Sequence, residues 1–344
     1  MKLLRFLLFP FSIVYNTITS IRNCFFDIGV FKSASFPIPI IAVGNLSVGG
    51  TGKSPQIEYL IRLLKNDYKI AVLSRGYKRK TKGFQLVSQL HTTDDIGDEP
   101  MQFYKKFGKS IYVAVDANRK NGIQQLLALK NPPEVILLDD AYQHRKVKAS
   151  TYILLTKFDD LFINDFVLPT GNLRESRRGV KRADAIVVTK CPKNVSVLEQ
   201  DEIVRRLAPK KNQEVFFSTI MYDEILGGGE SITIQDISEG EVLLVTGIAN
   251  PSTLLTYLES RKIKFKHLKF PDHHHFSKED ILKIKISFKD ISSHKKNILT
   301  TEKDFVRLEG KIENLLYITI KNTILNSEDL FKSFVYSEVK KLKK

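Results

Sequence analysis

The sequence predicts an α/β protein with a P-loop NTPase-like domain and a second, smaller α/β domain. An apolar run at residues 38–43 turns into a glycine-rich loop and then into helical spacing at residues 55–64. Apolar and amphipathic segments alternate along the rest of the chain, as they do where helices connect the parallel strands of doubly wound sheets. The glycines at 227–229 interrupt this alternation, which then starts again. We therefore expect a P-loop kinase domain over residues 37–222 and the smaller domain over residues 230–344.

The glycine-rich loop has the composition of a phosphate-binding site. Glycines let backbone N–H groups turn inward around phosphate oxygens, at the positive end of the following helix. Lys53 would reach the β and γ oxygens, and Ser54 would hold Mg²⁺. The match to G-x-x-x-x-G-K-[ST] is imperfect, because Ser47 stands where the first glycine is expected. A tight turn with a surface lysine is the alternative, but a chance Gly-Lys-Ser is rarely flanked by a buried strand and an amphipathic helix. The expected nucleotide-binding residues are Gly49, Gly50, Thr51, Gly52, Lys53 and Ser54.

Residues 133–140 have the form of a Walker B element, an apolar strand that ends in Asp139 and Asp140. Such a strand normally lies beside the P-loop strand, which would place one of the two aspartates at the water shell of Mg²⁺. Two acids that only cap the next turn are the alternative. Gln143 and His144 follow directly, and we expect both to face the same site.

The remaining elements follow from the same alternation. Residues 69–77 form an expected second strand, which delivers Arg75 and Tyr77 to the sheet edge where ligands bind in open α/β sheets. Further strands are expected at residues 111–115, 151–155, 185–189, 214–219, 265–268, 297–300 and 315–320, and from residue 241. Helices are expected at residues 101–107, 119–130, 198–207 and 278–287, and from about Pro251 and Ser327.

Several polar segments have roles that the pattern alone leaves open. The loop at residues 168–178 carries three arginines and Glu175, so it is either a site for an anionic or polyhydroxyl ligand or a plain basic surface loop. Asp98 opens a helix and fits a simple cap as well as a catalytic carboxylate. Residues 300–304 follow a strand, where a loop for the nucleotide base could lie.

Three adjacent histidines, residues 273–275, precede a helix whose predicted capping box is Ser277 with Asp280. They lie just ahead of the positive end of that helix. Because three consecutive side chains cannot all face one ion, we do not expect a metal site here. A plain surface loop is the simplest interpretation of the run taken alone.

The composition is that of an ordered globular protein, with 42% apolar and 27% charged residues in a chain of 344. The formal net charge of +16 implies an anionic partner, whether nucleic acid, an acidic membrane surface or a phosphorylated ligand. Cys24 and Cys191 are far apart and lack metal spacing, which makes a reducing cytoplasm the default.

Residues 1–36 are the expected membrane-associating segment. Arg5 and Pro10 interrupt its apolar run and Asn16 ends it, far short of the ~20 clean apolar residues that a spanning helix needs. Seven of the 22 phenylalanines lie here with four basic residues and one acid, which suits an interfacial position on anionic lipid. No small-residue cleavage site of a signal peptide follows. A helix that covers the core of its own domain is the alternative.

Eight motifs in collinear order resemble the lipid A 4'-kinase family, also called the tetraacyldisaccharide 4'-kinase family. They span residues 43–55, 74–77, 97–100, 138–144, 168–175, 247–251, 271–274 and 301–304. The departures are small: Ser54 replaces the commoner threonine, Ala141 stands where glycine is usual, and His274 and His275 extend the histidine motif.

The resemblance implies transfer of the γ-phosphate of ATP, with Mg²⁺, to the 4'-hydroxyl of an acylated glucosamine disaccharide 1-phosphate. It also implies two α/β/α domains with the active site in their cleft, at the cytoplasmic face of the bacterial inner membrane. It puts Lys53 and Ser54 on the phosphates and Mg²⁺, and it makes Asp98 the base with His273 as its partner. The implied metal-side polar set is Glu99, Asp139, Asp140 and Gln143. The implied acceptor contacts are Arg75, Tyr77, Arg119, His144, Arg174 and Glu175.

Two other functional classes remain as alternatives. A GTPase or metal-insertion chaperone could also combine a P-loop with a histidine run, but residues 189–192 lack the asparagine and aspartate of a guanine-reading N-K-x-D. A nucleic-acid ATPase is suggested only by the basic charge, and we find no stacking-aromatic motif for it. We therefore expect no nucleic-acid partner.

Overall fold

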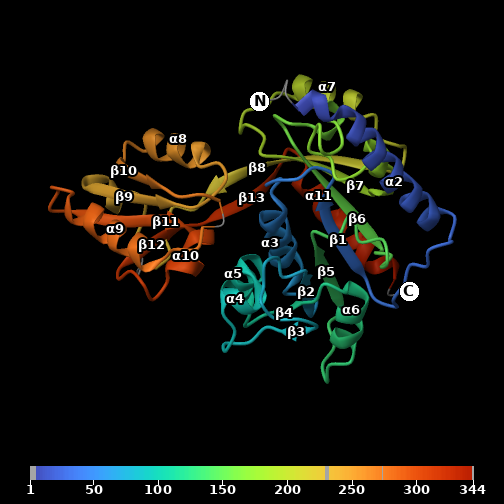
Figure 1. Ribbon diagram of the computed structural model, residues 1–344, viewed down its shortest axis with the longest axis horizontal. Coiled ribbons are helices and arrows are strands. Elements are labelled where there is room, and N and C mark those ends of the chain that lie inside the picture. The colour runs from blue at the N-terminus through green and yellow to red at the C-terminus, as the bar shows by residue number, and fades with distance from the viewer. Residues whose placement is uncertain (1–4, 229–231, 273, 343–344) are drawn as a thin grey trace.

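The computed structural model describes residues 5–228, 232–272 and 274–342, and Figure 1 shows their arrangement as two sheet domains connected by long strands. The strands of the larger domain are β1 (Ile40–Asn45), β2 (Ile70–Ser74), β3 (Gln85–Leu86), β4 (Tyr112–Val115), β5 (Val135–Asp139), β6 (Thr151–Lys157), β7 (Ala185–Thr189), β8 (Glu214–Tyr222) and β13 (Ile320–Leu325). Its helices are η1 (Phe6–Leu8), α2 (Phe9–Asp27), α3 (Lys53–Leu64), α4 (Thr93–Ile96), α5 (Asp98–Phe107), α6 (Arg119–Leu127), η2 (Phe162–Asn164), η3 (Arg177–Arg182), α7 (Val197–Leu207) and α11 (Glu328–Lys341).

The smaller domain holds its own parallel sheet. Its elements are η4 (Asp236–Glu239), β9 (Glu241–Thr246), α8 (Ser252–Ser260), β10 (Lys264–Lys269), α9 (Lys278–Lys289), β11 (Lys296–Thr301), α10 (Glu302–Leu308) and β12 (Leu315–Ile318). Within the described residues its four strands run in the order β10-β9-β11-β12. Helix α8 packs its leucines on one face of this sheet, and α9 and α10 pack on the other.

The larger sheet has the order β13-β8-β7-β6-β1-β5-β2-β4-β3 over the described residues. Strand β1 pairs in parallel with β5 on one side and with β6 on the other, so the Walker B strand lies beside the P-loop strand, as expected. Every residue of β1 and β5 is buried, because helices cover both faces of the sheet. The α/β fold class and its two layered sheets are thereby confirmed.

Both edges of the large sheet depart from the expected parallel arrangement. Strand β3 pairs antiparallel with β4, and β13 pairs antiparallel with β8. Only Thr319 separates β12 from β13, so one extended stretch serves first the small sheet and then the large one. The expected strand at 315–320 is therefore two strands.

The expected extent of the smaller domain, residues 230–344, is wrong for the last part of the chain. Strand β13 belongs to the large sheet, and α11 buries Phe331, Val335 and Val339 in the core that also contains Ile57 of α3. A strand and an amphipathic helix were expected here, but their apolar pattern does not say which sheet edge they complete. The two crossing strands β8 and β13, which run side by side between the domains in Figure 1, join the two sheets.

Helix α2 lies on the outside of the large domain, and its apolar side chains do not form a core. Only Ser12 and Thr19 of this helix are buried, which excludes the alternative of a core-covering apolar helix. Within the described parts of the chain, no helix combines the length and the hydropathy needed to cross a bilayer.

Candidate active site

The P-loop connects β1 to α3 through two glycines with left-handed backbone. Gly49 has a φ of 101° and Gly52 a φ of 86°, values at which a residue with a Cβ is strained. Gly52 is the N-cap of α3, and Lys53 is the first residue of the helix. Thr51 is buried, where its hydroxyl accepts from the Asn45 amide at 2.7 Å and its carbonyl accepts from Thr189 at 2.8 Å. These hydrogen bonds to Asn45 and Thr189 therefore fix the loop, which presents its backbone at the carboxyl end of the sheet.

The absence of glycine at position 47 has a structural explanation. Ser47 forms an antiparallel bridge with Leu173, and the neighbouring backbones exchange hydrogen bonds from Val48 N to Asn172 O and from Arg174 N to Leu46 O. The loop at residues 166–174 thus runs alongside the entrance of the P-loop. An extended, paired residue can take this position, because the backbone turn comes later, at Gly49.

This pairing brings Arg174 into the site with Lys53 and Asp140. The Arg174 guanidinium donates to both carboxylate oxygens of Asp140 at 3.0 Å, and Lys53 Nζ lies 3.5 Å from Asp140 Oδ1. Burial by itself would raise the pKa of Asp140, but the two cations outweigh it and lower that pKa. Asp140 is therefore ionised at neutral pH, and the two cations that it holds stand beside the P-loop.

Asp139 lies in a different environment although it is the adjacent residue. It is buried at the end of β5, where Ser74 donates to its Oδ2 at 3.1 Å and its Oδ1 has no hydrogen-bond partner. Burial, followed by the negative charges of Glu99 and Asp140, raises the pKa of Asp139 to about 7. Ser54 donates to Glu99 Oε1 at 3.2 Å, which places Glu99 opposite the first turn of the P-loop helix.

These oxygen donors fit Mg²⁺. Ser54, Glu99 and Asp139 present hard oxygens, and the unpaired buried Oδ1 of Asp139 is a polar atom that a hydrated cation would satisfy. No cluster of three His, Cys, Asp or Glu side chains in the described parts of the chain forms a metal cage.

Two residues expected to contact the acceptor are buried instead. Glu175 is fully buried, and its carboxylate accepts from Asn23 at 2.6 Å, Arg182 at 2.8 Å and Gln143 at 3.0 Å. Arg119 is 2% exposed and donates to the backbone carbonyls of Asp116 and Asp139. Neither side chain is exposed to a ligand in this structure, and direct contact of the two residues with the acceptor stays a prediction.

Gln143 was expected among the metal-side groups. Its amide donates to Asn45 O at 2.8 Å and to Glu175, so its N–H group is committed to holding the P-loop strand against the loop that carries Arg174. Helix α2 also contacts this loop. Its Asn23 amide donates to the Glu175 carboxylate, and its Tyr15 hydroxyl donates to the Arg174 carbonyl at 2.9 Å. Helix α2 is thus hydrogen-bonded to the loop that shapes the site.

The remaining acceptor candidates gather at the carboxyl end of β2 and β5. Arg75 and Tyr77 are exposed. Burial lowers the pKa of both Arg119 and His144, and the positive charge of Arg75 adds a smaller lowering effect. Burial is the largest cause for His144 and lowers its pKa to about 4, so this imidazole is neutral at pH 7. A neutral imidazole beside exposed arginine suits a polar or anionic ligand.

Asp98 is the first residue of α5, with Gly97 at the N-cap, so its carboxylate is not the cap of that helix. It lines a small cavity of about 30 Å³ together with Tyr77, Lys78, Glu99 and Pro100. Its side chain forms an ion pair with Arg307 from α10 of the smaller domain. His273, the expected partner of Asp98, lies outside the described residues. Sequence reasoning missed Arg307, for which the only signal is its place three residues after the motif that ends in Asp304.

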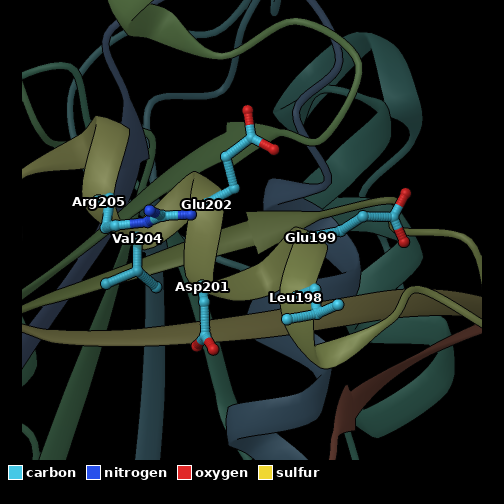
Figure 2. A pocket seen from close by; sticks show the side chains of 6 residues that line it. All are labelled: Leu198, Glu199, Asp201, Glu202, Val204 and Arg205. Atoms are coloured by element: carbon cyan, nitrogen blue, oxygen red, sulfur yellow. The ribbon is translucent and has the colours of Figure 1, made fainter.

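A larger hollow of about 590 Å³ lies elsewhere, along the outer side of α7. Figure 2 shows its lining, which is Leu198, Glu199, Asp201, Glu202, Val204 and Arg205. All six come from one helix, and none belongs to the P-loop, the Walker B strand or the acceptor set. The hollow on α7 is therefore not the candidate active site. That site lies where the P-loop backbone, the cations Lys53 and Arg174, and the carboxylates come together.

Comparisons with known proteins agree with this geometry. The sequence profile of the tetraacyldisaccharide-1-P 4'-kinase family (LpxK) matches residues 4–340. The tetraacyldisaccharide 4'-kinase of Flavobacterium psychrophilum is 55% identical over 344 residues, covering 98% of both chains. This chain belongs to the tetraacyldisaccharide 4'-kinase family. The enzyme of Flavobacterium johnsoniae is 53% identical over 99% of this chain and 98% of its own. The activity is accordingly that of an ATP-binding kinase of lipid A biosynthesis.

The fold agrees as well. A crystal structure of LpxK from Aquifex aeolicus in complex with ATP superimposes with a TM-score of 0.78 at 32% identity, covering 98% of this chain and 99% of that one. The family membership removes the guanine-nucleotide and nucleic-acid alternatives as accounts of the activity.

The contact of α2 with the site gives a first prediction. Asn23→Ala leaves the buried Glu175 carboxylate with one donor fewer, which we expect to cost about 1–3 kcal/mol of unfolding free energy. It also loosens Gln143 and the Arg174 loop, so we expect kcat in detergent micelles to fall by about threefold or more. Urea denaturation and phosphate transfer to detergent-dispersed lipid measure the two effects. Thr17→Ala, on the exposed side of the same helix, is the control and should leave both unchanged. Wild-type kcat in Asn23→Ala would mean that α2 is only an anchor.

Proposed function

We propose that Lys53, Ser54, Asp98 and Asp139 carry out Mg²⁺-dependent transfer of the γ-phosphate of ATP to the 4'-hydroxyl of tetraacyldisaccharide 1-phosphate. The observation that carries this assignment is the meeting of three groups at one sheet edge: the P-loop backbone, the Lys53–Asp140–Arg174 cluster and the pair formed by Ser54 and Glu99. Phosphoryl transfer needs charge neutralisation at the γ-phosphate and an aligned nucleophile, and little covalent help from the protein.

The triphosphate lies on the backbone N–H groups of residues 49–53, at the positive end of α3. Lys53 is held ready by Asp140 and moves onto the β and γ oxygens when the nucleotide arrives. Arg174 shares that carboxylate and adds a second cation at the same place. Ser54, Glu99 and Asp139 would hold Mg²⁺, which supplies charge neutralisation for phosphoryl transfer when it is bound.

Asp98 receives the proton of the acceptor. An alcohol is too weak an acid to ionise beforehand, so the carboxylate accepts the proton while the new O–P bond forms. The bond between the γ-phosphorus and the bridging oxygen breaks, and ADP leaves. Asp98 is the first residue of α5 and is adjacent to Glu99, one of the residues that would hold Mg²⁺. Both residues line the small cavity that Tyr77 also lines. His273 is the proposed partner that orients Asp98.

Arg75, Tyr77 and His144 are the proposed acceptor contacts, with Arg119 behind them.

Mutagenesis of the base tests this assignment. In transfer of labelled γ-phosphate from ATP to purified tetraacyldisaccharide 1-phosphate in micelles, we expect Asp98→Asn and His273→Ala to lower kcat by about 10²-fold or more. Both variants should retain ATP affinity within about threefold, because neither residue is proposed to touch the triphosphate. Lys53→Met serves as the contrasting variant and should lower kcat and ATP affinity together. Retention of wild-type kcat by Asp98→Asn would remove the base from the mechanism.

The raised pKa of Asp139 predicts how nucleotide binding depends on pH. A carboxyl must lose its proton to serve the Mg²⁺ shell, and the metal-free carboxyl titrates at about 7. Affinity for ATP with Mg²⁺ should therefore fall as pH drops below about 7, approaching about tenfold per pH unit. Affinity for ATP in the presence of EDTA should lack this dependence, and so should Mg²⁺-dependent binding to Asp139→Asn. Titrations between pH 5.5 and 8 measure it, and identical pH profiles with and without Mg²⁺ would contradict the role of Asp139.

We also propose that the enzyme works on an anionic membrane surface, at the cytoplasmic face of the inner membrane, with α2 lying in the interface. The inward side of α2 carries Ser12, Tyr15, Thr19 and Asn23, at helical spacing, and these hydrogen-bond to the protein or to the helix itself. The side chains that α2 exposes are instead mostly apolar; they include Phe9, Phe11, Ile13, Val14, Ile18, Ile21 and Phe25. This reversal of the usual helix amphipathicity supports burial in lipid, and the net charge of +16 supports an anionic surface.

Vesicle binding tests the membrane proposal. We expect Phe11→Ser combined with Ile18→Ser to lower partitioning onto anionic vesicles by about tenfold or more, because each substitution removes a large exposed apolar side chain. ATP hydrolysis or binding should stay unchanged. The matched control is Leu282→Ser with Ile286→Ser, two exposed apolar residues on α9 of the smaller domain. An equal effect of both pairs, or none for the α2 pair, would count against an interfacial α2.

A further inference from the structure

Arg307 connects the smaller domain to the proposed catalytic base. The residue is 8% exposed and belongs to α10 of the smaller domain. One terminal nitrogen donates to Asp304 Oδ1 at 3.2 Å, and the other forms the ion pair with Asp98 Oδ2. A single planar guanidinium therefore joins a carboxylate of the smaller domain to Asp98 of the larger one.

The Asp304 end of this bridge is rigid. Asp304 is fully buried, and its Oδ2 accepts from the Gly247 backbone N–H at 2.8 Å and from the Thr301 hydroxyl at 2.8 Å. A Cβ at position 247 would stand 2.9 Å from Asp304 Oδ1, so the close approach of the backbone requires glycine there. Residues 247–251, to which the sequence assigned no chemistry, and residues 301–304 thus meet at one buried carboxylate. Residues 302–308 form a helix, and the expected loop for the nucleotide base is not found there.

The Asp98 end belongs to a stripe of α5 that contacts the smaller domain. Asp98, Gln102 and Lys106 are spaced by four residues, which puts them on one side of the helix. Lys106 lies 2.9 Å from Glu302 of α10 and 2.9 Å from Glu58 of α3, and Gln102 donates to the same two carboxylates at 3.1 Å. Helix α10 is therefore fixed against α5 at three successive turns. Arg307 contacts the first turn of α5, through Asp98.

We propose that Arg307 is a positioning residue for the reaction, which orients the Asp98 carboxylate toward the acceptor hydroxyl from across the domain interface. This inference rests on the proposed role of Asp98 as the base. Charge-assisted bonds from a planar guanidinium fix the plane of a carboxylate better than a single-point donor does. A carboxylate has about four lone-pair directions, so a bond to an arginine does not by itself prevent it from accepting a proton. The smaller domain thereby contributes to the alignment of the base through Gly247, Thr301 and Asp304.

A double-mutant cycle tests the inference. We expect Arg307→Gln to lower kcat for lipid phosphorylation by about 10- to 100-fold while the KM for ATP stays within about twofold. Combined with Asp98→Asn, the same change should cost less than about twofold more, because a residue that acts through Asp98 has nothing left to orient. Arg307→Lys should recover part of kcat, since it keeps the charge but cannot bridge both carboxylates. Arg261→Gln is the control: it removes an arginine from the same domain that pairs with Glu224 on the surface.

The outcomes separate the two proposals. If Asp98→Asn keeps wild-type kcat, the role of Asp98 fails and the inference fails with it. If Asp98→Asn loses activity but Arg307→Gln keeps wild-type kcat, or loses the same factor in both backgrounds, only the inference fails and Arg307 is a structural residue. Should Arg307→Gln not fold, the cycle is run with Arg307→Lys, for which a smaller loss of kcat that vanishes in the Asp98→Asn background supports the inference and an additive loss overturns it.

Discussion

The parallel pairing of β1 with β5 is the constraint on which the rest of the site depends. It brings the end of the P-loop strand next to the end of the Walker B strand, although about ninety residues separate them in the chain. Lys53, at the start of the helix after β1, can then meet Asp140, which directly follows β5, because both strands end at the same sheet edge. The sheet is fully buried here and cannot shift without breaking its hydrogen-bond ladder, so these groups stand in place before any nucleotide binds.

Adjacent aspartates on one strand end perform different work because their surroundings differ. Asp140 faces two cations and keeps its charge, whereas Asp139 points into the sheet beside Ser74 and holds its proton up to about neutral pH. The difference follows from the backbone at the end of the strand. Asp139 is the last residue of β5, whereas Asp140 lies beyond it with a φ of 46°, a value that few non-glycine residues adopt.

The sequence predicted what local patterns determine. The strand–glycine loop–helix unit, the paired aspartates and the capping box of Ser277 with Asp280 each lie within a short window, and the structure contains all three. Burial set by distant partners escaped prediction. Glu175 was expected to contact the acceptor, but it is buried, and one of its partners, Asn23, lies 152 residues earlier in the chain. The proposed role of Arg307 depends likewise on its contact with Asp98, 209 residues away in the chain. The strand pattern of β13 does not indicate which of the two sheets the strand joins.

The sharing of one extended stretch between β12 and β13 has a consequence for how the molecule is made. The chain leaves the large sheet after β8 at Tyr222 and returns to it only at Ile320, with the whole smaller sheet built in between. On the ribosome, the β8 edge of the large sheet therefore stays unpaired until nearly the last residues emerge, and the face that α11 covers stays open. The nucleotide-binding half cannot finish folding before the other half has been synthesised, so a truncated chain exposes a strand edge and apolar surface. An early stop in translation thus yields a chain suited to capture by chaperones or proteases rather than a free-standing ATP-binding domain.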